Sequence, residues 1–159
     1  VKERSFKIYM ADTGLLTFMT GPGIAGKIVS GDRSVNNGAV MENAVAVMLL
    51  QNGYDPFFFQ KSNSTLEIDF IISGPDGPIA IEVKSGRYDY PKSLITVMSE
   101  RYGVEKGILL AEENIRTDDY GVIHLPLFAP CFLGPAGCSD VPPVDDVDRL
   151  NKELGRSIP

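Results

Sequence analysis

The chain has little of the chemistry on which many metal and redox sites depend. Its 159 residues include no tryptophan, one histidine and two cysteines. The lone His124 excludes a zinc site built from several histidines. Cys131 and Cys138 have no neighbouring metal ligands, so we favour reduced structural thiols over a disulfide.

Long apolar runs and an excess of positive charge are also missing. No run approaches the roughly 18 residues that cross a membrane, and no signal peptide is recognisable. We therefore expect a cytoplasmic protein without a membrane partner. The 15 basic and 21 acidic residues give a net charge of -6, which argues against nucleic-acid binding through bulk positive charge. A nucleic-acid enzyme with a small local site remains compatible with this balance.

The patterning predicts one α/β domain over residues 1–133 and a Pro/Gly-rich, acidic tail over 134–159. Because the chain opens at Val1 in mid-pattern, we expect an N-terminal region to be missing. Helices are expected after Asp12, at 39–50, from Pro91 to about 102 and at 145–154. Strands are expected at 5–10, 55–60, 65–72, 79–84, 107–111 and 122–125, with a loop at 21–38. This order predicts a mixed sheet flanked by helices.

Residues 21–27 satisfy the phosphate-loop spacing G-x-x-x-x-G-K. Ile28 stands where the loop needs a hydroxyl for magnesium, and no helix is expected directly after it. We therefore interpret the segment as an ordinary loop and not as a nucleotide site.

The informative residues lie in the hairpin around the turn at 74–77. A turn centred there places Asp69 opposite Glu82 and Glu67 opposite Lys84. Alternation would put all four side chains on one sheet face, away from Phe70 and Ile81 in the core.

Like charges that close destabilise a sheet unless a cation joins them. Mg²⁺ or Mn²⁺ with oxygen ligands is the natural candidate, and without metal at least one of the acids should have a raised pKa. The alternative is a solvated sheet face with a Glu67–Lys84 ion pair.

Glu42 adds a further acid, on the expected helix at 39–50. Ten of these twelve residues are apolar, so the helix should be buried. A carboxylate there is costly unless it is paired or bound to a cation. The alternative is a first-turn carboxylate stabilised by the helix dipole.

Together these residues resemble the PD-(D/E)XK nuclease signature, here E-x26-D-x12-E-V-K, with spacing similar to that of archaeal Holliday junction resolvases. Four stretches also resemble the uncharacterised C-terminal domain of predicted prokaryotic AAA-type ATPases: residues 7–16, 67–70, 81–86 and 123–127. The resemblance covers roughly residues 5–130.

The resemblance implies a restriction endonuclease-like α-β-β-β-α-β core and a Mg²⁺- or Mn²⁺-dependent phosphodiesterase site. Asp69 and Glu82 would ligate the metal, with the Val83 carbonyl as a third oxygen. Glu42 would complete or orient the site, and Lys84 would position the attacking water.

The implied partners are nucleic acid, DNA above all, the N-terminal ATPase domain of the same protein, and a second copy in a homodimer. Candidate phosphate contacts near the site are few: Gln60, Lys61, Arg87 and Lys92. The rival interpretation is a non-catalytic binding or regulatory module of the ATPase that retains the nuclease fold.

Overall fold

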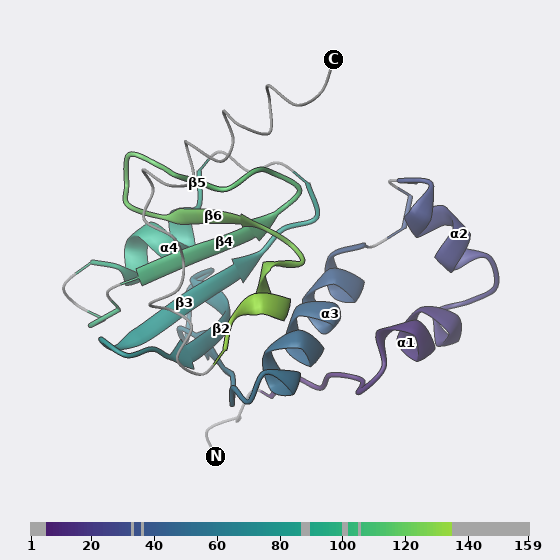
Figure 1. Cartoon of the computed structure of the whole chain (residues 1–159), viewed down its shortest axis with the longest axis horizontal. Coiled ribbons are helices and arrows are strands. Elements are labelled where there is room, and N and C mark those ends of the chain that lie inside the picture. Colours follow the sequence, from purple (N-terminus) through teal and green to yellow (C-terminus); the bar gives the residue numbers. More distant parts are fainter. Residues whose placement is uncertain are drawn as a thin grey trace.

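A mixed six-stranded sheet forms the centre of the computed structural model (Figure 1). The structure describes residues 6–134 except 33, 36, 87–89, 100–101 and 105. Arg87, Cys138 and the helix expected at 145–154 lie outside the described residues.

The elements follow one another in the order expected from the sequence between the first long helix and the fourth strand, so the α/β class with a mixed sheet is confirmed. They are α1 (Thr13–Met19), α2 (Ile24–Val29), α3 (Asn37–Gln51), β1 (Phe57–Gln60), β2 (Glu67–Ser73), β3 (Pro78–Val83), α4 (Lys92–Val97), β4 (Lys106–Ala111), β5 (Arg116–Thr117), β6 (Ile123–Pro126) and the 3₁₀-helix η1 (Ala129–Phe132).

The strands lie in the order β1-β2-β3-β4-β6-β5. The β1–β2–β3 meander is antiparallel, while β3, β4 and β6 run parallel. A parallel pair needs a crossover connection, and α4 supplies it between β3 and β4. The pairs Phe70–Ile81 and Ser73–Pro78 confirm the predicted hairpin register.

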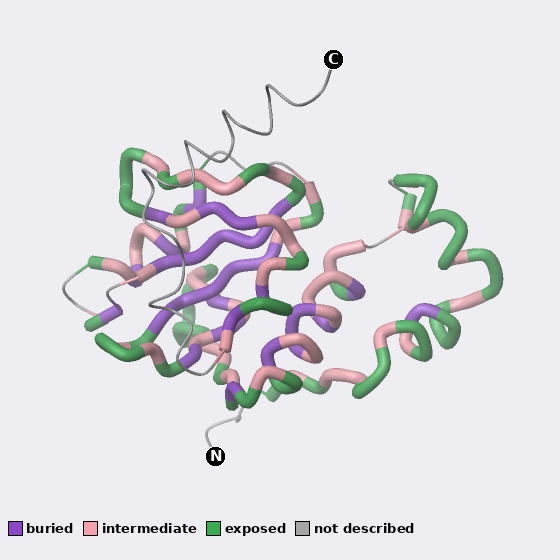
Figure 2. Tube along the Cα trace, viewed as in Figure 1, coloured by how far each residue is buried: buried purple, intermediate pink, exposed green. Residues whose placement is uncertain are grey.

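Helices cover both faces of the sheet, and the central strands between them are buried (Figures 1 and 2). On one face Ala46 and Leu49 of α3 pack in a cluster with Phe70 and Ile81. On the other face Leu94 of α4 packs in a second cluster, which contains the strand residues Ile68, Ala80 and Leu109. These three layers explain why β3 and β4 are apolar almost throughout.

The prediction of a strand at 5–10 is wrong for residues 6–10, because these residues adopt no regular secondary structure. Instead, the Met10 amide donates to Asn43 Oδ1 (2.7 Å), and Asn43 Nδ2 donates to the Met10 carbonyl (3.1 Å). A buried side chain of α3 thus takes the place of a neighbouring strand. The segment then enters α1, where Asp12 accepts from the Leu15 amide as the predicted cap.

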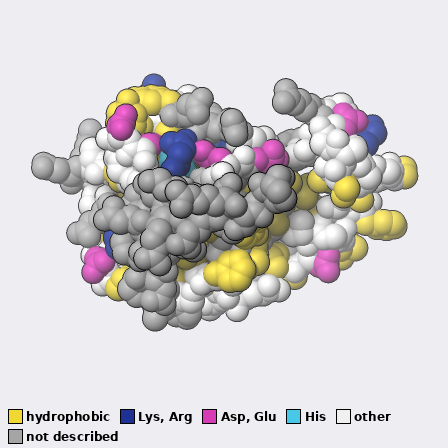
Figure 3. Space-filling model, turned by 45° about the horizontal axis from the view of Figure 1, so that its top comes forward, with side chains coloured by type: hydrophobic (Ala, Val, Ile, Leu, Met, Phe, Trp, Pro, Cys, Tyr) yellow, Lys and Arg dark blue, Asp and Glu magenta, His cyan; other side chains and the backbone are white. Residues whose placement is uncertain are grey.

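The loop expected at 21–38 contains the short helix α2, so that part of the expectation is wrong. Gly26 and Lys27 lie inside this helix, and not in a loop before it, which agrees with the rejection of a phosphate loop. α2 has no buried residue, and α1 and α2 stand apart from the sheet (Figure 1). Leu15, Phe18 and Met19 of α1 and Val29 of α2 expose large apolar side chains, and Figure 3 shows apolar side chains on this side of the molecule.

Asn43→Ala should destabilise the domain, because the peptide groups of Met10 and the Thr13 hydroxyl lose their partner. We expect a loss of about 2–3 kcal/mol in the free energy of unfolding, measured by urea denaturation. The exposed Asn114→Ala serves as the control and should change stability by less than about 0.5 kcal/mol. Equal stability of Asn43→Ala and wild type would contradict the anchoring role.

Candidate carboxylate–lysine site

The site forms where β2 leaves its regular alternation. Between the pairs Phe57–Ile71 and Phe59–Ile68, β1 contributes one residue and β2 contributes two. This is the count of a β-bulge. As a result Ile68 packs on the α4 side of the sheet, while Phe70, two residues on, packs on the α3 side.

The bulge changes the face of the acidic residues of β2. Ile68 points to α4, so Glu67 and Asp69 point to the α3 side. The expectation that Asp69 faces away from Phe70 is therefore wrong. Glu82 pairs with Leu109 in the regular part of the sheet and shares the α4 side with it. The prediction that all four side chains share one sheet face is therefore wrong, because the acids of β2 lie on the α3 side and Glu82 lies on the α4 side. They interact where β2 and β3 separate.

Asp69 lies where β2 and β3 separate. The paired part of the hairpin ends at Phe70–Ile81, so the expected pairs Asp69–Glu82 and Glu67–Lys84 fall beyond it. Asp69 Oδ2 accepts a hydrogen bond from the backbone amide of Val83 at 2.9 Å. A side chain thus satisfies a strand amide at the point where the ladder stops.

Lys7 joins three carboxylates on the α3 side. Its ammonium lies 2.9 Å from Glu42 Oε1, 2.9 Å from Glu67 Oε1 and 3.4 Å from Asp69 Oδ1. The three acids come from α3 and from β2, and Lys7 comes from the segment anchored by Asn43. Its side chain is only 21% exposed, so these contacts are partly shielded from water.

Glu42 is held firmly at its place on α3. It accepts a hydrogen bond of 2.7 Å from the Tyr9 hydroxyl besides the one from Lys7. The helix begins at Asn37, so Glu42 is not in its first turn, and the helix-dipole alternative fails. The sequence expectation that this carboxylate is paired or cation-bound is met by Lys7.

The site has two halves: Lys7 with its three acids on the α3 side, and Glu82 with Lys84 on the α4 side. Glu82 is 6% exposed, and its Oε1 atom pairs with the Lys84 ammonium at 2.7 Å. The other oxygen, Oε2, is buried without a hydrogen-bond partner. A buried carboxylate oxygen without a partner is unusual and costly.

The shifts in pKa reflect this crowding. Burial raises the pKa of Asp69; the Val83 amide opposes this, and the charge of Glu42 adds to it. Burial also raises the pKa of Glu82 against the pull of Lys84. Burial alone would lower the pKa of Lys7, but its bonds to Glu67 and Glu42 raise it overall. The raised pKa values of Asp69 and Glu82 have the direction that the sequence analysis expected for at least one acid of the cluster.

The site carries more negative than positive charge. Four carboxylates, those of Glu42, Glu67, Asp69 and Glu82, face the two ammonium groups of Lys7 and Lys84, an excess of two negative charges. The two halves affect each other, because Asp69 raises the pKa of Glu82 and Lys84 lowers that of Asp69. Within the described residues, no three His, Cys, Asp or Glu side chains are arranged to hold a metal ion.

Sequence reasoning singled out Glu42, Asp69, Glu82 and Lys84 but assigned no role to Lys7 or Tyr9. Lys7 lies 35 residues from Glu42, in a segment assigned as a strand, and no spacing rule connects the two. The available signal was the run at 7–16, which carried part of the family resemblance.

The structure places three of the four candidate phosphate-contact residues. Lys61 lies on the surface with its ammonium 3.4 Å from the Tyr102 hydroxyl, Gln60 ends β1, and Lys92 begins α4. A pocket of about 410 Å³ adjoins the site, lined by Lys7, Ile8, Tyr9, Met10, Leu16, Ala39, Glu42, Asn43 and Glu67.

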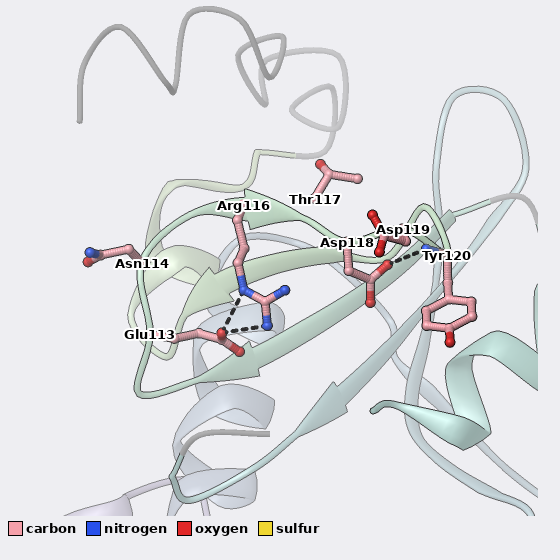
Figure 4. A pocket seen from close by; sticks show the side chains of 7 residues that line it. All are labelled: Glu113, Asn114, Arg116, Thr117, Asp118, Asp119 and Tyr120. Atoms are coloured by element: carbon pink, nitrogen blue, oxygen red, sulfur yellow. Dashed lines mark hydrogen bonds and ion pairs between the residues drawn. The ribbon is translucent and has the colours of Figure 1, made fainter. Parts of the chain in front are cut away.

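A second pocket, of about 530 Å³, lies beside β5 and the turn that follows it (Figure 4). Beneath it the fully buried His124 contacts Glu113 Oε1 with Nδ1 (2.7 Å) and Asp118 Oδ2 with Nε2 (3.1 Å). Arg116 pairs with the other oxygen of Glu113. Burial would raise the pKa of Asp118, but bonds from His124 and from backbone amides lower it overall. The network ties β6 to the segment that carries β5.

These observations define an α/β domain with a mixed sheet and a charged carboxylate–lysine cluster where two strands part. A family model described as "Domain of unknown function (DUF4143)" matches residues 37–128. The match covers more than half of the chain, so the chain belongs to this family. It spans α3 to β6 and includes all four predicted catalytic side chains, while Lys7 precedes it.

No curated protein matches the chain. Among the described residues, no helix combines the length and apolar character needed to cross a membrane.

Glu82→Gln should flatten the pH dependence of stability. Because the pKa of Glu82 is raised in the fold, the native state binds more protons than the unfolded state above the ordinary value of 4.5. Stability from this group is therefore lost as the pH rises through the folded pKa. Urea denaturation from pH 4 to 7 should show a steeper fall for wild type than for Glu82→Gln. Parallel curves would contradict the raised pKa.

His124→Leu should destabilise the domain by about 3–5 kcal/mol, because Asp118 and Glu113 lose a buried partner. Thermal and urea unfolding measure the loss. Thr117→Ala, an exposed change on β5, is the control and should be close to neutral. A His124→Leu protein as stable as wild type would show that the network does not hold this edge of the sheet.

Proposed function

We propose that the domain is a metal-dependent nuclease-like domain that acts on nucleic-acid phosphodiesters. The observation that carries the proposal is the buried, unpartnered Glu82 Oε2 in a cluster with two excess negative charges. A divalent cation carries the charge that balances this excess. Oxygen ligands suit Mg²⁺ and Mn²⁺, and Mg²⁺ commonly uses only one or two carboxylates in addition to water and phosphate oxygens.

The order of elements supports the finer fold assignment. From α3 to β4 the order is helix, three strands, helix, strand, as in the restriction endonuclease-like core. The acids occupy α3, β2 and β3, and Lys84 follows β3 directly. We therefore propose that the domain has the restriction endonuclease-like fold with a PD-(D/E)XK site.

Asp69 and Glu82 would hold the cation, with the Val83 carbonyl as a third oxygen. When bound, Mg²⁺ or Mn²⁺ would offset phosphate charge and make water more acidic. The Lys84 ammonium, fixed by Glu82, would orient the attacking water and stabilise the negative charge that develops on the phosphate. Glu42 would keep the α3 side of the site in place through Tyr9 and Lys7.

The second candidate is a non-catalytic module that binds nucleic acid or protein, in which the cluster is structural. One observation favours it: Lys7 already pairs with three of the four acids. Both candidates allow for the N-terminal ATPase domain as a partner, and for a homodimer. Cytoplasmic location and DNA as the nucleic acid belong to the same proposal.

Metal binding should raise the melting temperature of the wild type but not that of Glu82→Gln. A ligand that binds only the native state stabilises it by about 2.7 kcal/mol at a hundredfold excess over Kd. Without metal, Glu82→Gln should be as stable as wild type or slightly more so, because the burial of one charge is relieved. Melting curves with and without Mn²⁺ measure both effects, and an equal shift in wild type and Glu82→Gln would contradict the assignment of Glu82 as a ligand.

Lys84→Ala separates the two candidates. In a nuclease this variant should keep the Mn²⁺-induced shift and lose cleavage at least about a hundredfold, since one preorganised charge at the reacting phosphate is removed. Single- and double-stranded DNA and RNA are the substrates to assay. A wild type that binds Mn²⁺ and cuts none of them would favour the binding module.

A further inference from the structure

The Lys7 ammonium is the positive charge that the three acids of the α3 side share. It contacts carboxylates from two separate elements at 2.9, 2.9 and 3.4 Å. One of these contacts is with Asp69 Oδ1, and Asp69 is a ligand in the proposed metal site. The ammonium and a divalent ion are therefore drawn to the same negative charge.

We propose that Lys7 is an internal counter-cation that competes with the divalent metal for this site. The inference rests on the proposed function, because it concerns the same carboxylates. Metal binding would then require the ammonium to give up Asp69, and the metal affinity of the wild type would be set partly by Lys7.

The surroundings of Lys7 make such an exchange feasible. Residues 6–10 form no strand, so Lys7 can move without breaking a hydrogen-bond ladder. The segment remains attached three residues on, where Met10 binds Asn43. The stem of Lys7 is long, and its ammonium also lies 5.8 Å from the centre of the Phe58 ring, on β1 and outside the acid cluster.

A purely structural role for Lys7 predicts the opposite change in metal affinity when Lys7 is removed. If Lys7 served only to hold Glu42, Glu67 and Asp69 in a ligand arrangement, its removal would scatter them and weaken metal binding. If it competes, its removal raises the excess from two to three negative charges and frees Asp69 Oδ1. Affinity for hard cations rises with the charge of the ligand set.

The test compares the Mn²⁺ affinity of wild type, Lys7→Met and Lys7→Gln by isothermal titration calorimetry at fixed ionic strength and neutral pH. Lys7→Met keeps the apolar stem, and Lys7→Gln provides a second neutral variant if the first folds poorly. Circular dichroism and melting curves establish that each variant is folded. Lys106→Gln is the matched control, because it removes an ion-paired lysine at the other end of the sheet.

Removal of Lys7 should lower the Kd for Mn²⁺ about tenfold, because a positive charge a few ångströms from the ion is lost. Lys106→Gln should leave the Kd unchanged. Binding by the Lys7 variants alone would also support the competition. An unchanged or higher Kd in folded Lys7 variants, beside a wild type that binds, would overturn the inference and leave the proposed function standing. No binding by any of the proteins would overturn the metal site itself.

Discussion

The attraction between the Lys7 ammonium and three carboxylates determines how the N-terminal segment, α3 and β2 meet. Without a cation, Glu42, Glu67 and Asp69 would repel one another at a partly buried position. With it, residues far apart in the chain form one unit, to which Tyr9 adds a hydrogen bond on Glu42. The cluster is therefore a folding contact as well as a candidate site, and the two roles share the same atoms.

The two halves of the site are balanced differently. On the α3 side the Lys7 ammonium pairs with three acids, whereas on the α4 side the Lys84 ammonium pairs with Glu82. Yet the unpartnered oxygen belongs to Glu82, so the remaining demand for a cation lies at the strand junction and not around Lys7.

Much of the fold could be predicted because it depends on periodicity and turns. The apolar run of α3 and the turn at 74–77 were sufficient to predict the helix and the hairpin register, although α3 buries only part of its surface and leaves Leu50 exposed. The bulge at Asp69 could not be predicted, since it depends on pairing with β1 and leaves no signature in the alternation itself. The segment at 6–10 was assigned as a strand because its pattern fits one; the side chain of Asn43, a tertiary partner, decided otherwise. Lys7 was missed for the same reason.

The hydrogen bond between Asp69 and the Val83 amide affects how relatives of this chain should be compared. Its carboxylate accepts from the Val83 amide in place of a backbone carbonyl, and so acts as a wedge between two strands that would otherwise continue to pair. A descendant that had lost all activity would still need an acceptor there to keep the strands apart. A side-chain acceptor at position 69 would therefore be retained for structural reasons alone. The Lys84 side chain pairs with Glu82, so position 84 is the more informative one to compare for the proposed catalytic role.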